Sequence, residues 1–376
     1  MTAIGPVSID MYLPGFPAIE RDFATRGVEV TMAAFIVGIA VGQLFYGPIS
    51  DRFGRKPPLY VGFAVYMIGA LGCALAVNMT MLTVMRVVQA LGGCAGLVIG
   101  RAIVRDRCEP HEAARAFTTL TMIVALGPVL APAVGGVIVT HFGWRATFVV
   151  QVAIALTLML TMHRVLTESH VTPDTSVSFA DILRNYARLS RDRHFMALSL
   201  LLGFSMASMF CYVTGAPTVI TQNYGLSAQQ FGALIGLNGL AFMSASMLNM
   251  RALQTMTPRQ VLARYVWASP LLGLALLILS WMFALPLWAV VSLQLLFFVT
   301  VGRVGPNVSA LALAPHGRAA GTASALMGAT QSALTTCAGI AVAIFNDGTV
   351  HTLAAIMTAG AALALICYLW IRRTIS

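Results

Sequence analysis

The stretch Gly47-Pro48-Ile49-Ser50-Asp51-Arg52-Phe53-Gly54-Arg55-Lys56-Pro57 is a short charged turn between two almost wholly apolar runs. The runs, at residues 31–46 and 58–77, approach the roughly 20 apolar residues that a membrane-spanning helix needs. The turn itself holds three cations and one acid. Because cytoplasmic loops of membrane proteins carry an excess of Lys and Arg, the turn predicts which side of a membrane faces the cytoplasm.

The composition indicates a membrane protein along the whole chain. Of its 376 residues, 58% are hydrophobic and 10% are charged, whereas soluble domains carry about 25% charged residues. We therefore expect an all-α integral membrane protein. Twelve apolar runs predict its transmembrane helices, at residues 1–19, 31–50, 58–77, 80–101, 117–139, 145–163, 195–220, 230–250, 261–282, 285–303, 319–344 and 350–371.

The basic residues predict the orientation. Sixteen Lys and Arg lie in the loops after even-numbered spans and at the C-terminus, against three in the opposite loops, which places both termini in the cytoplasm. The same distribution explains the net charge of +10 without a nucleic-acid partner. The six Cys lie singly, so neither a metal site nor a disulfide is predicted.

The longest loop divides the chain. We expect one six-helix bundle at 1–163, a cytoplasmic linker at 164–194 and a second six-helix bundle at 195–376. Within the linker, Ser178 is placed to cap a helix, with Asp181 three residues on. An apolar face follows at Phe179, Ile182, Leu183, Tyr186 and Leu189. This pattern favours a helix on the cytoplasmic membrane surface, and the alternative is a solvated linker helix.

The two halves repeat weakly. Tyr12-Leu-Pro-Gly15-Phe-Pro17 matches Tyr212-Val-Thr-Gly215-Ala-Pro217 in its Tyr, Gly and Pro at an offset of 200 residues. Gly100-Arg101 matches Gly302-Arg303 at an offset of 202, and Asn249 falls near the position equivalent to Asp51. Paired six-helix halves of this kind are typical of secondary transporters.

Two ionisable residues are predicted deep in the membrane. Asp10 lies ten residues from Glu20 at the outer end of the first span, roughly 15 Å along a helix. Arg86 lies eight residues from Asn78, roughly 12 Å from the outer end of the fourth span. Their similar depths suggest that both face one central cavity, where Asp10 would exchange a proton under the influence of Arg86. The alternative is a static structural pair.

The fifth span combines small residues with proline. It reads Gly127-Pro128-Val-Leu-Ala-Pro132-Ala-Val-Gly135-Gly136. Small residues at this spacing allow a close helix approach, and prolines remove backbone donors and bend a helix. We expect a pliable, tightly packed helix between the halves, and the alternative is an ordinary kinked packing helix.

Further candidates lie in the charged turn and in the spans. Asp51 is placed to bond a helix N-terminus and to pair with Arg52 or Arg55, so that the turn, with Gly47 and Gly54, forms a cytoplasmic gate. The alternative is that the turn serves topology alone. Polar residues within spans are candidates for the substrate cavity or for bonds between helices: Tyr12, Gln89, Tyr212, Asn238 and Gln331.

Four of these motifs resemble those of a known family. Gly47–Pro57 resembles the loop 2–3 signature of the major facilitator superfamily, and Arg86-Val-Val-Gln89-Ala-Leu-Gly92 resembles its helix-4 motif. Gly127–Gly136 is similar to the helix-5 motif of its drug/proton antiporters, and Asp10-Met-Tyr12-Leu13-Pro14 to the helix-1 signature of the bicyclomycin-resistance (Bcr/CflA) branch. The chain departs from the family in starting inside the first span and in the eroded second-half turn at Asn249.

The resemblance implies a function. It predicts two bundles that rock about a central cavity in a bacterial inner membrane, and proton-driven efflux of small hydrophobic or amphiphilic drugs by a monomer without a cofactor. Asp10 and Arg86 would couple protons, and Asp51, Arg52 and Arg55 would belong to the gate. The nearest alternative is an uptake symporter for a small metabolite on the same fold. A membrane enzyme is disfavoured, because the spans show no nucleophile–base pair or metal cluster.

Overall fold

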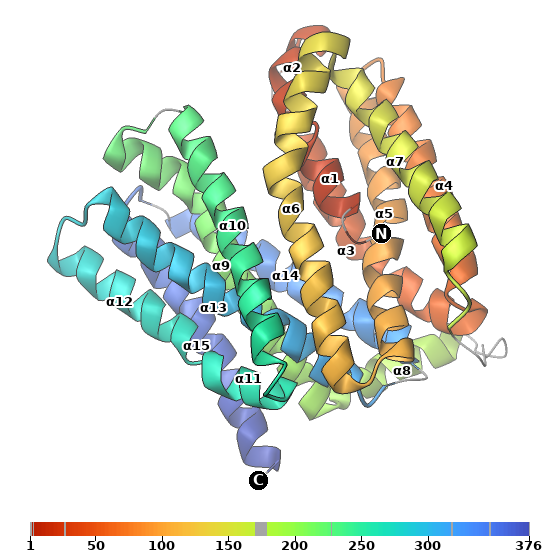
Figure 1. The fold of residues 1–376 in the computed structure, drawn as a ribbon. Coiled ribbons are helices and arrows are strands. Elements are labelled where there is room, and N and C mark those ends of the chain that lie inside the picture. The colour runs from red at the N-terminus through yellow and green to blue at the C-terminus, as the bar shows by residue number, and fades with distance from the viewer. Residues whose placement is uncertain are drawn as a thin grey trace. The chain divides into compact units, whose positions relative to one another are not determined.

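The computed structural model of the protein describes residues 2, 4–25, 28–169, 179–226, 228–316, 319–345 and 347–375. Every regular element in these residues is helical (Figure 1). In chain order the elements are α1 (Ile4–Asp10), η1 (Leu13–Gly15), α2 (Phe16–Phe23), α3 (Glu29–Phe53), α4 (Lys56–Ala74), α5 (Met79–Arg107), α6 (Pro110–Phe142), α7 (Trp144–Val165), α8 (Phe179–Arg191), α9 (Arg193–Tyr224), α10 (Ala228–Ala252), α11 (Pro258–Tyr265), α12 (Ala268–Met282), α13 (Leu287–Leu313), α14 (Ala320–Phe345) and α15 (Val350–Ile375).

Each predicted span coincides with helical structure, but two of the spans are interrupted. The first runs through α1 and η1 into the beginning of α2, because Pro14 and Pro17 have no backbone N–H to continue a single helix. The ninth consists of α11 and α12, and α11 begins at a capping box formed by Thr257 and Gln260. In the linker, α8 lies at the predicted position, whereas the predicted cap Ser178 lies outside the described residues.

The lengths of the helices fit a bilayer. Within the described residues, nine helices are long and apolar enough to cross a membrane, and α6 adds a shorter apolar segment at Leu130–Phe142. Many large hydrophobic side chains on these helices face outward, for example Val61 and Ile68 on α4. A soluble protein would bury such residues, so the exposed apolar surface is the surface that lipid covers.

The chain forms two compact units. One holds residues 1–107, 126–186 and 316–329, and the other holds 108–125, 187–315 and 330–376. The beginning of α14 thus belongs to the unit built mainly from the first half of the chain, and the beginning of α6 to the unit built mainly from the second half. The division at 163 and 195 that the sequence suggests stays a prediction.

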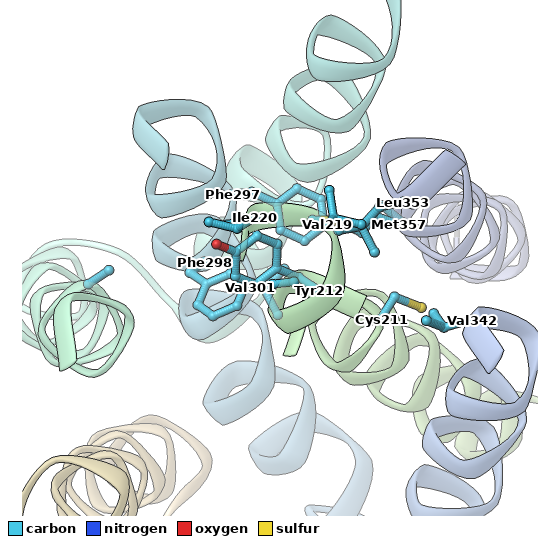
Figure 2. Close-up of a cluster of buried hydrophobic side chains, with 13 residues drawn as sticks. Cys211, Tyr212, Val219, Ile220, Phe297, Phe298, Val301, Val342, Leu353 and Met357 are labelled. Carbon is cyan, nitrogen blue, oxygen red and sulfur yellow. The ribbon is translucent and has the colours of Figure 1, made fainter. Parts of the chain in front are cut away.

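Each unit has its own apolar core. In the first unit, one buried cluster gathers Tyr12, Trp144 and Phe148, and another gathers Phe63 and Ile99. In the second unit, a buried cluster packs side chains of α9, α13 and α15 around Tyr212 (Figure 2). These cores hold the polar residues described below in fixed positions.

Candidate functional site

Asp10 is the last residue of α1, where the first span breaks. The backbone N–H of Met11 makes the last helical bond, to Val7, and η1 begins two residues later. The Asp10 side chain is partly exposed, and within the described residues it has no hydrogen-bond or ion-pair partner. The break therefore presents a carboxylate that no neighbouring side chain neutralises.

Arg86 on α5 is fully buried and is held by neutral groups. Its Nη1 donates to the Ser8 carbonyl oxygen at 3.1 Å and to Gln89 Oε1 at 2.7 Å. The rings of Tyr12 and Phe35 lie 4.4 and 4.1 Å from its guanidinium carbon, within the range of cation–π attraction. A buried cation usually needs a partner of opposite charge, and here aromatic rings and amide oxygens surround it instead.

The structure does not join Asp10 to Arg86 directly. Among the described residues no ion pair links them, and Arg86 Nε and Nη2 have no hydrogen-bond partner. Arg86 nevertheless bonds Ser8, two residues before Asp10 on the same short helix. The connection between the two residues in this structure is therefore the short helix α1 and not a salt bridge.

Gln89 belongs to a buried hydrogen-bond network that sequence reasoning did not predict. Gln89 Nε2 donates to Gln151 Oε1 at 2.7 Å, and Tyr66 Oη donates to the same oxygen at 3.3 Å. Tyr66 Oη also lies 2.6 Å from Ser8 Oγ, so the network returns to α1. The signal in the sequence was a polar side chain inside an apolar span, at Tyr66 and at Gln151.

The other cavity candidates are mostly packed inside their units. Tyr12 is buried and its hydroxyl lies 2.6 Å from Thr31 Oγ1. Tyr212 is buried too, with its ring edge-on to Phe298 at a centroid distance of 5.7 Å (Figure 2). The paired tyrosines of the sequence repeat thus occupy similar aromatic surroundings.

Two amide candidates differ in their surroundings. Asn238 Oδ1 on α10 accepts from Gln294 Nε2 on α13 at 2.9 Å, which is the bond between helices that mid-span amides often make. Gln331 on α14 is partly exposed, and its backbone passes close to Gly203.

The charged turn holds the beginning of α14. The Asp51 carboxylate accepts from the backbone N–H groups of Gly321 and Thr322, at 2.9 and 2.7 Å, and from Thr322 Oγ1 at 2.6 Å. An aspartate at a helix N-terminus satisfies unpaired N–H groups and is stabilised by the helix dipole. Glycines make this approach possible, because a Cβ on Gly47 would lie 2.5 Å from the Gly321 carbonyl oxygen.

Arg55 connects Asp51 to α5. Its Nη1 donates to Asp51 at 2.6 Å and its Nε to Asp106 at 2.8 Å, and the arginine is fully buried. Of the two pairings that the sequence allowed for Asp51, the structure has the one with Arg55. Arg52 instead lies over the Phe53 ring at 5.1 Å. Asp106 was not predicted, because it lies 51 residues from Arg55, among basic residues just after a predicted span.

The turn is shaped by Gly54 and capped by the linker. Gly54 has a φ of 86°, which favours glycine. Glu168 then accepts from the backbone N–H groups of Arg55 and Lys56, at 2.9 and 3.0 Å, and so caps α4. This carboxylate is the second unpredicted acid of the turn.

In the second unit, Asn249 on α10 makes the contact that corresponds to Asp51. Its Nδ2 donates to Thr118 Oγ1 on α6 at 2.7 Å, and its Oδ1 accepts from Asn307 Nδ2 at 2.8 Å. All three side chains are fully buried. The two units thus hold these helices differently: a charged carboxylate bonds the first turn of α14, whereas a neutral amide bonds the side chain of Thr118 further along α6.

The glycines of α6 fall into two classes. A Cβ on Gly135 would overlap the carbonyl oxygen of Met11, and one on Gly127 would lie 2.7 Å from Pro6 Cβ, so both glycines pack against the first span. Gly136 faces open space. Pro132 lies within the continuous helix, as does Pro128, whose side chain lies outside the described residues.

Comparison with known proteins identifies the family. The family model described as Major Facilitator Superfamily matches residues 1–340. The chain belongs to this superfamily. Its members are secondary transporters with twelve helices in two six-helix bundles, so the fold class predicted from the sequence is confirmed.

Relatives of this major facilitator are similar along most of their length. It is 33% identical to the uncharacterized MFS-type transporter YdgK of Bacillus subtilis, over 98% of this chain and 92% of the relative. It is 30% identical to a bicyclomycin resistance protein homolog of Haemophilus influenzae, over 98% and 93%, and 28% identical to multidrug resistance protein D of Escherichia coli, over 88% and 84%. The solved structure of the Escherichia coli fucose:proton symporter FucP superposes with a TM-score of 0.78 at 17% identity, over 98% of this chain and 95% of that one, which shows the fold alone.

Proposed function

We propose that this major facilitator exports small, mostly hydrophobic or amphiphilic drugs in exchange for protons. The observation that carries the proposal is Asp10, a carboxylate without a partner at the break of the first span. The last residue of a helix lies at the negative end of the helix dipole, where an anion is disfavoured. A proton and a drug are then alternative ways of stabilising the same site.

The surroundings of Asp10 support coupling. Arg86 bonds the carbonyl of Ser8 on the same seven-residue helix, and Gly135 of α6 packs against Met11 directly after Asp10. A change in the charge of Asp10 therefore acts on the packing of α1 against α5 and α6. These are the elements that alternating access would move.

The names of the relatives support the choice of substrate. Two of them are named for resistance to bicyclomycin or to multiple drugs. Hydrophobic and amphiphilic compounds of this kind enter from the cytoplasm or the inner leaflet, compete with the proton on Asp10 and leave outward. One charge that moves inward across ~100 mV supplies about 2.3 kcal/mol, which sustains a concentration ratio of roughly tens.

We also propose a bacterial inner membrane, both termini in the cytoplasm and a monomer as the working unit. The turn at Asp51 and Arg55 lies on the cytoplasmic side in this orientation, where its bonds to α14 form the gate. No resident cofactor is needed, since the proton gradient is the energy source.

The test is transport by Asp10→Asn in inverted membrane vesicles under an imposed pH gradient. The neutral amide should abolish proton-driven drug accumulation, while the amount of inserted protein stays unchanged. Asp181→Asn, which removes an exposed acid from α8, serves as the matched control and should transport normally. Undiminished proton-driven transport by Asp10→Asn would refute the assignment, and proton-driven movement out of the vesicles would indicate an uptake symporter.

A further inference from the structure

The part of α3 around Pro48 contains a backbone carbonyl that the helix cannot satisfy. Pro48 lies inside α3 and has no N–H, so the carbonyl oxygen of Leu44, four residues earlier, lacks its helical donor. Leu44 lies within the apolar span, and its side chain is exposed. Where no water is available, a carbonyl left without a donor is costly, and another group must supply the bond.

The linker supplies this bond. The hydroxyl of Tyr186 on α8 donates to the Leu44 carbonyl oxygen at 2.6 Å. Burial and the nearby charge of Asp51 raise the pKa of Tyr186, so the hydroxyl keeps the proton that it donates. A tyrosine near a membrane surface is well suited to this role, because its ring lies in apolar surroundings while its hydroxyl reaches a polar group.

The position of Tyr186 connects this bond to two other elements. Tyr186 is the last residue of its unit, and α8 continues beyond it to Arg191. Directly after α8, Asp192 Oδ1 accepts from the backbone N–H groups of His194 and Phe195, at 3.0 and 3.1 Å, and so caps α9. The helix α8 therefore bonds α3 through Tyr186 and is followed directly along the chain by α9.

We propose that Tyr186 is a positioning residue for the transport cycle, in that its hydroxyl replaces the missing amide of Pro48 and holds the turn of α3 from which Asp51 reaches α14. Pro48 lies three residues before Asp51 and directly after Gly47, which packs against Gly321. The direction of this turn decides whether the Asp51 carboxylate meets the amides of α14. This inference rests on the proposed function as a transporter and adds the linker to its moving parts.

The test is a double-mutant cycle on transport rates. Tyr186→Phe removes only the hydroxyl and should lower the maximal rate about fivefold with KM unchanged, as the loss of one hydrogen bond predicts. Pro48→Ala restores the amide that Leu44 lacks, so in that background Tyr186→Phe should change the rate by less than ~2-fold. Tyr60→Phe is the matched control, because it removes a cytoplasmic-side hydroxyl that bonds His163 and not α3.

A second measurement covers the case in which Pro48→Ala does not insert. Hydrogen–deuterium exchange of the peptide that spans residues 44–53 should increase in Tyr186→Phe and stay unchanged in Tyr60→Phe. An equal loss of rate from Tyr186→Phe in both backgrounds, or unchanged exchange in this peptide, would overturn the inference. If the unmodified protein moved no drug, the proposed function would fail, whereas the exchange measurement would still decide the role of Tyr186.

Discussion

Two adjacent glycines of α6 allow a sharp test of how the first span is held. A Cβ added at Gly135 would overlap the carbonyl oxygen of Met11 and lie 2.8 Å from its carbonyl carbon. The obstacle is backbone, which cannot rotate away as a side chain can. A Cβ added at Gly136 meets nothing within 4 Å. We therefore predict that Gly135→Ala destabilises the protein and that Gly136→Ala does not.

The expected difference in stability between the two variants depends on two free-energy terms, of which the first is the same in both. Each substitution places alanine in the middle of a helix and gains roughly 0.5–1 kcal/mol of helix propensity. Only Gly135→Ala adds the cost of overpacking, which is about 1–3 kcal/mol when backbone must shift. The two variants should therefore differ by this overpacking cost, which at ~2–4 °C per kcal/mol for a unit of this size gives ~2–12 °C in Tm.

The assay is thermal unfolding of purified variants in the same detergent. Drug transport provides a second readout, because Met11 follows Asp10 and a displaced first span would also disturb the proton exchange that we propose at Asp10. Equal melting temperatures for Gly135→Ala and Gly136→Ala would refute the close packing of α6 against the first span. A lower Tm for Gly136→Ala would refute it more strongly.

Three further predictions concern side-chain hydrogen bonds that hold helices together. Asp51→Asn removes the charge that bonds the first turn of α14, so the maximal transport rate should fall about tenfold or more, at ~1.5–3 kcal/mol for a charge-assisted hydrogen bond. Hydrogen bonds from the Trp144 indole and from Arg145 lower the pKa of Asp22, so its contribution to stability is present above the ordinary value of 3.8 and is lost as the pH falls through the lowered pKa. Asn249→Leu and Thr118→Val should destabilise the second unit non-additively, because both remove the same buried bond.

Each of these predictions has a control. For Asp51→Asn the control is Asp181→Asn on the linker surface, and equal rates would contradict the role of the turn. For Asp22 the comparison is with the Tm of Asp22→Asn. This Tm should lie below that of the unmodified protein near neutral pH and approach it in acid. A difference in Tm that stays constant with pH would contradict the predicted pH dependence. For Asn249 and Thr118, strictly additive changes in Tm would show that their bond contributes nothing.

Local patterns predicted much of the architecture. The apolar runs predicted helical structure at all twelve spans, since the length of a span is set by the bilayer and needs no tertiary contact. The break after Asp10 was not predicted, although Pro14 and Pro17 lie shortly after it and prolines act on the backbone of their own helix. The repeat of Tyr12 and Tyr212 pointed to two related halves, and both tyrosines are buried.

The sequence did not predict most of the hydrogen-bond partners of the candidate site residues. Arg86 was expected to act with Asp10, yet it is held by Ser8, Gln89 and aromatic rings. Asp106 and Glu168 support the charged turn from distant points of the chain, and Tyr186 supports α3 from the linker. These contacts depend on which parts of the helices lie next to each other in the folded protein. The spacing of residues along the chain does not predict this.

The sequence by itself determined that this chain is a multi-pass helical membrane protein, because hydropathy and charge act residue by residue wherever the chain lies in a bilayer. It also located the charged turn and the acid within the first span. Only the tertiary structure decided that Asp51 holds α14, that Gly135 and not Gly136 packs against the first span, and that a tyrosine replaces the amide missing at Pro48. These contacts depend on distances between helices far apart in the chain, and van der Waals overlap and hydrogen bonding change within fractions of an ångström.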